Sequence, residues 1–87
     1  MGVSSFKWKS IKDGDVTVYC EGENGRFFTG IEYIGVDLHG NQMWSGTLFS
    51  KESGKLITVN EFGTPFTSLE SAKEAIVRAA KRWEDVQ

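Results

Sequence analysis

The side chains best suited to nucleophilic catalysis are one cysteine, Cys20, and one histidine, His39. A cysteine nucleophile acts as the thiolate, which needs a nearby base and an electropositive pocket. Cys20 follows Val16 and Val18 at alternate positions of a β-type run, where a small buried hydrophobic side chain is expected. His39 stands in a turn beside Gly40, and one histidine without a second ligand at a defined spacing specifies no metal site. We therefore predict a protein that is not an enzyme and binds no metal or cofactor.

Nucleic-acid binding is the second chemistry that the residues allow. The first 12 residues contain three bases and no acid: Lys7, Lys9 and Lys12. These lysines could hold phosphates, while Tyr33, Trp44 or Phe49 could stack on bases. Residues 13–67, however, carry eight acids against three bases, a net charge of −5 that repels a phosphate backbone. Weak nucleic-acid binding is therefore the alternative function, and we expect such binding to be absent or weak.

The composition describes one small soluble domain. The chain has 87 residues, of which 39% are hydrophobic, 13% aromatic and 25% charged. This length allows one hydrophobic core, so we predict a single domain over residues 1–87. No apolar run reaches the length of a membrane span, and the first residues lack the apolar region of a secretory signal. A single cysteine forms no internal disulfide and fits a reducing compartment, so we expect a cytoplasmic protein that contacts no membrane.

Turns rich in glycine divide the first 62 residues into segments of strand length. Four of these segments are rich in β-branched and aromatic residues: 16–20, 26–36, 42–49 and 56–62. They predict an antiparallel meander over residues 15–62. Residues 1–12 alternate in polarity at Phe6-Lys7-Trp8-Lys9, and they form either an N-terminal arm or an extra edge strand.

The C-terminal segment has the pattern of an amphipathic helix, predicted over residues 68–84. Its apolar residues recur at helical spacing: Leu69, Ala72, Ile76, Ala79, Ala80 and Trp83. The alanines let the helix lie close to the sheet, and Trp83 is a predicted core anchor. Thr67 and Glu70 occupy the positions of a capping box at the helix start. The predicted fold is therefore α+β, an antiparallel four-stranded β-meander with a possible extra N-terminal edge strand, packed against one C-terminal α-helix.

The same segment resembles the last helix of small bacterial proteins of unassigned function, found in proteobacteria. The matching residues cover about the last quarter of the chain: Ser68, Glu70, Ala72, Ala79, Ala80, Trp83 and Asp85. This resemblance implies short strands followed by one helix ending in Ala-Ala-x-x-Trp, and it implies no activity. The helix is also similar to the last helix of double-stranded RNA-binding domains. In this chain Ser68, Glu70 and Ser71 replace the lysines that begin that helix, and Gly14 with the β-branched run after it excludes the N-terminal helix.

Two central strands carry large apolar residues on both of their faces. In residues 26–36 one face holds Phe27, Thr29, Ile31 and Tyr33, and the other holds Phe28, Gly30, Glu32 and Ile34. In residues 42–49 one face holds Met43, Ser45, Thr47 and Phe49, and the other holds Trp44, Gly46 and Leu48. One helix covers only one face of a sheet. Phe6 and Trp8 could fold over the second face, or the sheet could curl around its own aromatic side chains. The other possibility is that this face binds a partner.

We predict a small protein–protein interaction module that acts as an adaptor or an inhibitor. The candidate partner contacts are aromatic or sulfur-containing residues of the two central strands: Phe27, Tyr33, Met43, Trp44 and Phe49. The simplest partner is a second copy of the chain, which would form a homodimer, and another protein is the other possibility. Phe49 is expected to face outward and Trp44 to face the helix, because Gly46 beside Trp44 allows a close helix approach.

Overall fold

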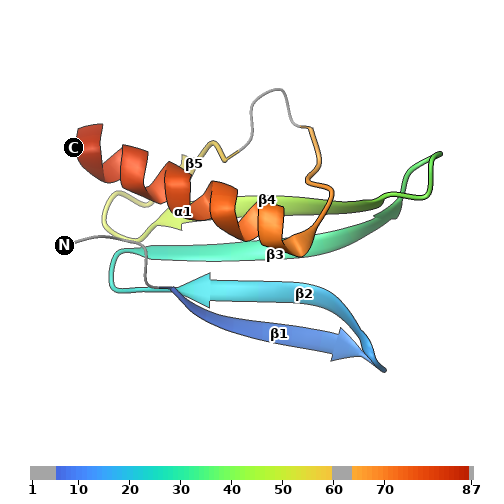
Figure 1. Ribbon diagram of the computed structural model, residues 1–87. Coiled ribbons are helices and arrows are strands. Elements are labelled where there is room, and N and C mark those ends of the chain that lie inside the picture. Colours follow the sequence, from blue (N-terminus) through green and yellow to red (C-terminus); the bar gives the residue numbers. More distant parts are fainter. Residues whose placement is uncertain (1–5, 60–63, 87) are drawn as a thin grey trace.

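The computed structural model describes residues 6–59 and 64–86, which form one antiparallel sheet and one helix (Figure 1). The strands are β1 (Lys7–Asp13), β2 (Val16–Glu23), β3 (Phe27–Val36), β4 (Gln42–Ser50) and β5 (Leu56–Ile57). The sheet order is β1-β2-β3-β4-β5, so each strand pairs with its neighbour in the sequence. The helix α1 (Leu69–Val86) lies on one side of this sheet and contacts β3, β4 and β5. The predicted α+β class is confirmed.

The described sheet has five strands where the sequence predicts a four-stranded meander. The extra strand is β1, which pairs with β2 along its whole length and settles the choice between an arm and an edge strand. Gly14 in the β1–β2 turn has a φ of 67°, a conformation that glycine adopts without a Cβ clash. At the opposite edge, β5 has two residues, and residues 60–62 of the predicted strand 56–62 lie outside the described part. Phe66 then forms an isolated antiparallel bridge with Trp44.

The helix starts one residue later than the predicted capping box requires. The Oγ of Ser68 accepts a hydrogen bond from the Ser71 N–H at 3.0 Å and lies 2.9 Å from the Ser71 Oγ. The Ser68 carbonyl accepts a hydrogen bond from the Ala72 N–H at 3.2 Å. Ser68 is therefore the N-cap, and the predicted Thr67–Glu70 box is wrong. Serine and threonine are both favourable caps, so residue type alone does not distinguish Thr67 from Ser68 as the N-cap.

The Ser68→Ala substitution should lower the free energy of unfolding by about 1 kcal/mol, because it leaves the Ser71 N–H without its side-chain acceptor. The matched control is Thr67→Ala, for which a change within about 0.5 kcal/mol is expected. Denaturant unfolding followed by circular dichroism measures both values. Equal losses of unfolding free energy in the two variants would show that Ser68 is not the N-cap.

The hydrophobic core lies between α1 and the sheet face that is formed by alternate residues of β3 and β4. Its buried members come from β2, β3, β4 and α1: Cys20, Phe27, Ile31, Trp44, Leu48, Ala72, Ile76, Ala79 and Ala80. Gly46 permits the close approach of the helix, since a Cβ at this position would lie 3.4 Å from side-chain atoms of Ile76 and Phe66. The predicted grouping of residues into faces and the predicted direction of Trp44 are both confirmed.

Phe6 and Trp8 extend this core instead of covering the second face. The Phe6 ring lies 5.4 Å from the Trp8 ring and 6.4 Å from the Phe27 ring, measured between centroids. The Lys73 ammonium of α1 lies 5.3 Å from the centroid of Trp8, on the helix side of the sheet. Both N-terminal aromatic residues therefore pack beside the helix, and they leave the opposite face of the sheet without a second layer in the described part of the chain.

Arg26 connects three parts of the fold at one end of the sheet. It lies in the β2–β3 turn, and its guanidinium is 2.9 Å from the carboxylate of Glu84 in α1 and 3.3 Å from that of Glu52 after β4. These ion pairs are partly exposed, so each contributes little to the stability. They do fix the C-terminal end of the helix relative to the turns.

Candidate functional site

The candidate site is the sheet face opposite α1, here called the uncovered face. Its clearest feature is one row of side chains that crosses all five strands in register. The row runs Lys7, Glu23, Phe28, Phe49 and Leu56, from β1 to β5. Because residues paired across antiparallel strands point to the same side, the last three form an adjacent apolar group. We call Phe28, Phe49 and Leu56 the apolar row.

The apolar row is open to solvent. Its side chains are 44% exposed at Phe28, 36% at Phe49 and 73% at Leu56. Large apolar residues in neighbouring positions of a sheet are normally covered by a second layer, and α1 lies on the other side. The apolar row is therefore the strongest sign of a contact surface in the described part of the molecule.

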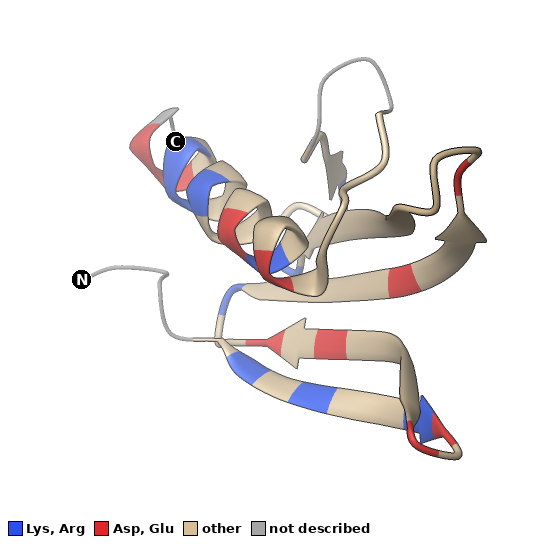
Figure 2. Cartoon of the chain, turned by 45° about the vertical axis from the view of Figure 1, so that its right-hand side comes forward, with Lys and Arg blue, Asp and Glu red and all other residues tan. Residues whose placement is uncertain are grey.

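The uncovered face changes character from β3 to β1. The next row contains Lys9 of β1, Glu21 of β2, Gly30 of β3 and Thr47 of β4. The phenol of Tyr19 lies over Gly30, which covers the backbone there. Figure 2 shows the lysines of β1 as blue bands beside the red glutamates of β2. In these two rows the charged side chains, here called the charged half, lie on β1 and β2, and the uncharged residues, here called the apolar half, lie on β3, β4 and β5. The row after them adds the exposed carboxylate of Glu32 on β3.

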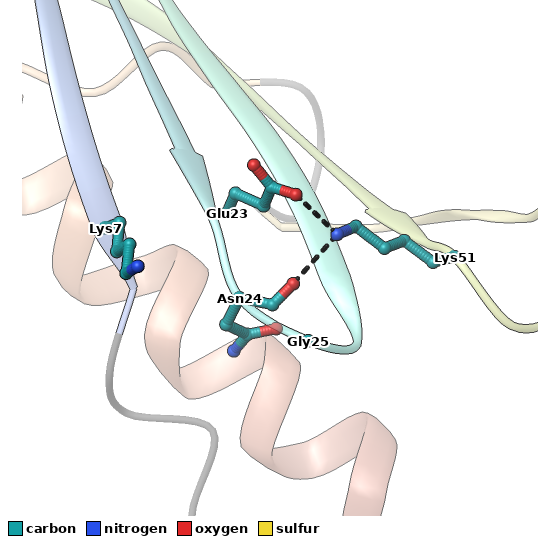
Figure 3. Close-up of a pocket in the computed structure, with 5 residues that line it drawn as sticks. All are labelled: Lys7, Glu23, Asn24, Gly25 and Lys51. Carbon is teal, nitrogen blue, oxygen red and sulfur yellow. Dashed lines mark hydrogen bonds and ion pairs between the residues drawn. The ribbon is translucent and has the colours of Figure 1, made fainter.

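A pocket at the end of the charged half is lined by Lys7, Glu23, Asn24, Gly25 and Lys51 (Figure 3). The Lys51 ammonium lies 2.7 Å from the Glu23 carboxylate and donates to the Asn24 carbonyl at 3.0 Å. The hydrogen bond from Lys51, and then its positive charge, hold the pKa of Glu23 below the ordinary value. Lys51 is therefore occupied in joining two turns, and the pocket brings together no nucleophile and base.

The structure places the five predicted partner contacts in different environments. Phe49 lies on the uncovered face, as the sequence predicts, and Met43 is half-buried at an alternate position of the same strand. Phe27 and Trp44 are buried beneath the helix, so they cannot contact a partner in the folded chain. Tyr33 is half-buried, with its ring packed edge-on against Trp44 at 5.1 Å between centroids. Phe27, Tyr33 and Trp44 are thus part of the core or of its border, which corrects the predicted surface.

Two residues of the site were missing from the predicted contacts, Phe28 and Leu56. The period of two places Phe28 on the face opposite Phe27, but nothing in the sequence states which residue of β4 lies beside it. Leu56 follows a glycine-containing turn and Lys55, where a strand edge gives no periodic signal. The signal that could have found both residues is the pairing of Phe28 with Phe49, and of Phe49 with Leu56.

The residues considered for catalysis lie apart. Cys20 is fully buried in β2, with its Sγ 4.0 Å from the Ser10 Oγ. It pairs with Ile31, and His39 lies in the turn beyond the end of β3 at Val36, so about 16 Å of strand intervenes. Within residues 6–59 and 64–86, no three His, Cys, Asp or Glu residues are grouped as metal ligands.

Asp37 has the turn-forming role that its position indicates. Its carboxylate accepts hydrogen bonds from the Asn41 N–H at 2.9 Å and from the His39 N–H at 2.8 Å. The Asn41 bond first, and then the His39 bond, lower the pKa of Asp37 below its ordinary value. Asp37 thus stabilises the β3–β4 turn as an anion, and His39 contributes its backbone to this turn.

The lysines of the alternative function all lie on β1. Lys7 pairs with Glu23 and Lys9 with Glu21, so acidic side chains stand beside two of the three lysines on the same face. Lys12 pairs with Thr17 near the β1–β2 turn. A phosphate backbone laid along β1 would therefore also meet the acidic column of β2. The arrangement gives this alternative less support than the sequence does.

None of the helices in the described ranges is both long and apolar enough to cross a membrane.

The comparisons with known proteins identify no relative of the chain. Comparison of the chain with protein-family models, with characterised proteins and with solved structures produced no match.

Proposed function

We propose that the chain is a small cytoplasmic protein–protein interaction module, which acts through its uncovered face as an adaptor or an inhibitor and has no catalytic activity. The observation that carries this proposal is the apolar row. Phe28, Phe49 and Leu56 stand side by side and are 36% to 73% exposed, although the helix covers the other face. Contiguous exposed apolar groups of this kind mark protein contacts, and aromatic residues are enriched there.

The charges of the uncovered face favour a protein over a nucleic acid as the partner. Its lysines on β1 are balanced by glutamates on β2, whereas the apolar row contains no charge. An apolar centre with a polar rim is the usual anatomy of a protein interface. A nucleic-acid surface would instead need bases in excess along the path of the phosphates.

Affinity capture with three forms of the chain tests the proposal. The wild type should retain a protein that the Phe49→Glu variant loses, because a charge at the centre of the apolar row must be desolvated on binding. Leu38→Glu is the matched control, since Leu38 is 101% exposed in the β3–β4 turn, away from the uncovered face. The control should bind as the wild type does, and circular dichroism should show both variants folded. Equal retention by Phe49→Glu and wild type would refute the proposed surface, as would a wild type that retains no protein and no second copy.

A further inference from the structure

We infer that the partner of the uncovered face is a second copy of this chain, packed sheet against sheet around a two-fold axis that runs along β4. The inference rests on the proposed function and adds to it the identity of the partner and the residues that meet. Its basis is the distribution of charge and apolar side chains over the uncovered face.

A two-fold axis along β4 sets apolar side chains of one copy against apolar side chains of the other. In the order of the sheet, β3 and β5 flank β4 on its two sides. A two-fold rotation about β4 therefore sets Phe49 against the partner's Phe49, and Leu56 against the partner's Phe28. The strands β1 and β2, with Lys7 and Glu23, then lie outside the contact, where their charges stay in water.

Other two-fold axes bring unfavourable pairs together. An axis across the strands, through the row itself, would set Lys7 and Glu23 each against its own copy, so like charges would meet. An axis along β3 would set Phe49 against the partner's Glu23 and bury that carboxylate against an aromatic ring. Among these arrangements, only the axis along β4 sets each residue of the apolar row against another residue of that row.

The edges of the sheet give no better contact between copies. The free edge strand β1 carries Lys7, Lys9 and Lys12, and lysines on an edge strand oppose pairing with a second strand. The other edge strand, β5, offers only two residues for a continuous sheet. Face-to-face packing therefore accounts for the exposed residues better than edge pairing does.

Cross-linking through single cysteines tests the arrangement. The background is Cys20→Ala, which removes the buried thiol. Thr47→Cys adds a thiol on the exposed side of β4, next to the axis, so a short bis-maleimide should join two copies across sheets about 10 Å apart. Lys9→Cys is the matched control on β1, three strands from β4, and its two copies would be about 29 Å apart. Adding Phe49→Glu to Thr47→Cys should reduce the cross-linked product at least tenfold.

Sedimentation of the uncross-linked chain at the same concentrations separates the possible failures. A dimer that cross-links through Thr47→Cys and not through Lys9→Cys supports the inference. A dimer that cross-links equally through both positions, or through Lys9→Cys alone, would overturn the axis along β4. A strict monomer would overturn the inference altogether, and the proposed function would still stand if capture of another protein depended on Phe49.

Discussion

The Trp44→Glu variant is expected to be unfolded under conditions in which the Phe49→Glu variant is folded. Trp44 is 4% exposed and contacts the Tyr33 ring edge-on, while its Nε1 donates to the Gln42 Oε1 at 3.1 Å. A glutamate at this position would place a carboxylate among apolar groups beneath the helix, and the side chain would leave a large cavity. Each of these effects costs several kcal/mol. Their sum is comparable with the whole free energy of unfolding of a small domain, which is about 5–15 kcal/mol.

The Phe49→Glu variant is the matched control because it makes the same kind of change five residues along the same strand. Phe49 points to the uncovered face, so its glutamate stays in water and the core is unchanged. Circular dichroism and thermal unfolding compare the two variants. A Trp44→Glu variant with cooperative unfolding near the wild-type temperature would show that the helix does not cover this face. Loss of folding in Phe49→Glu alone would show that the two faces are assigned the wrong way round.

The assignment of residues to faces follows from local pattern, and this part of the fold could be predicted. Alternation along β3 and β4 separates Phe27 from Phe28 and Trp44 from Phe49, because successive side chains of a strand point to opposite sides. The helix could be predicted for a similar reason, since its buried stripe recurs with helical spacing from Leu69 onward. Both patterns depend on residues that are near one another in the chain.

Pairing between strands is not local, and for this reason the site itself was predicted only in part. Phe28, Phe49 and Leu56 form the apolar row through register, which is determined by the turns and by the packing of the whole sheet. The predicted contacts instead took aromatic and sulfur-containing residues from both faces of two strands, so they mixed core residues such as Phe27 with the surface residue Phe49. Residue type separates core from surface only after the covering element has been placed.

The N-terminal segment shows a different limit of sequence patterns. The alternation at Phe6-Lys7-Trp8-Lys9 is typical of a strand, but four residues gave no indication of which face would be covered. The structure places Trp8 beside Gly22 of β2, where a Cβ would lie 2.7 Å from the Trp8 ring. The glycine thus makes room for the ring, and the Lys73 ammonium of α1 lies 5.3 Å from the ring centroid. Contacts between residues so distant in the chain have no periodic signal.

The Ile76→Ala variant should lose about 2–5 kcal/mol of unfolding free energy, the usual range for truncation of a fully buried isoleucine. Ile76 is 0% exposed, and its side chain packs over Gly46 of β4, where a Cβ would lie 3.4 Å from it. Trp83, the predicted core anchor, is by contrast only half-buried at the border of the core.

Truncation of Ile76 is therefore expected to cost more unfolding free energy per atom removed than truncation of Trp83. Truncation of Trp83 removes a larger side chain, but part of that side chain is already in water, so the loss per buried atom is smaller. Lys81→Ala is the matched control on the exposed side of α1 and should change the free energy by at most about 0.5 kcal/mol. Denaturant unfolding of the three variants at one protein concentration measures these values, because a second copy bound to the uncovered face would add its own stabilisation. A loss of unfolding free energy below about 1 kcal/mol in Ile76→Ala would contradict the close contact between α1 and β4. Trp83 would then be the main residue that holds the helix against the sheet.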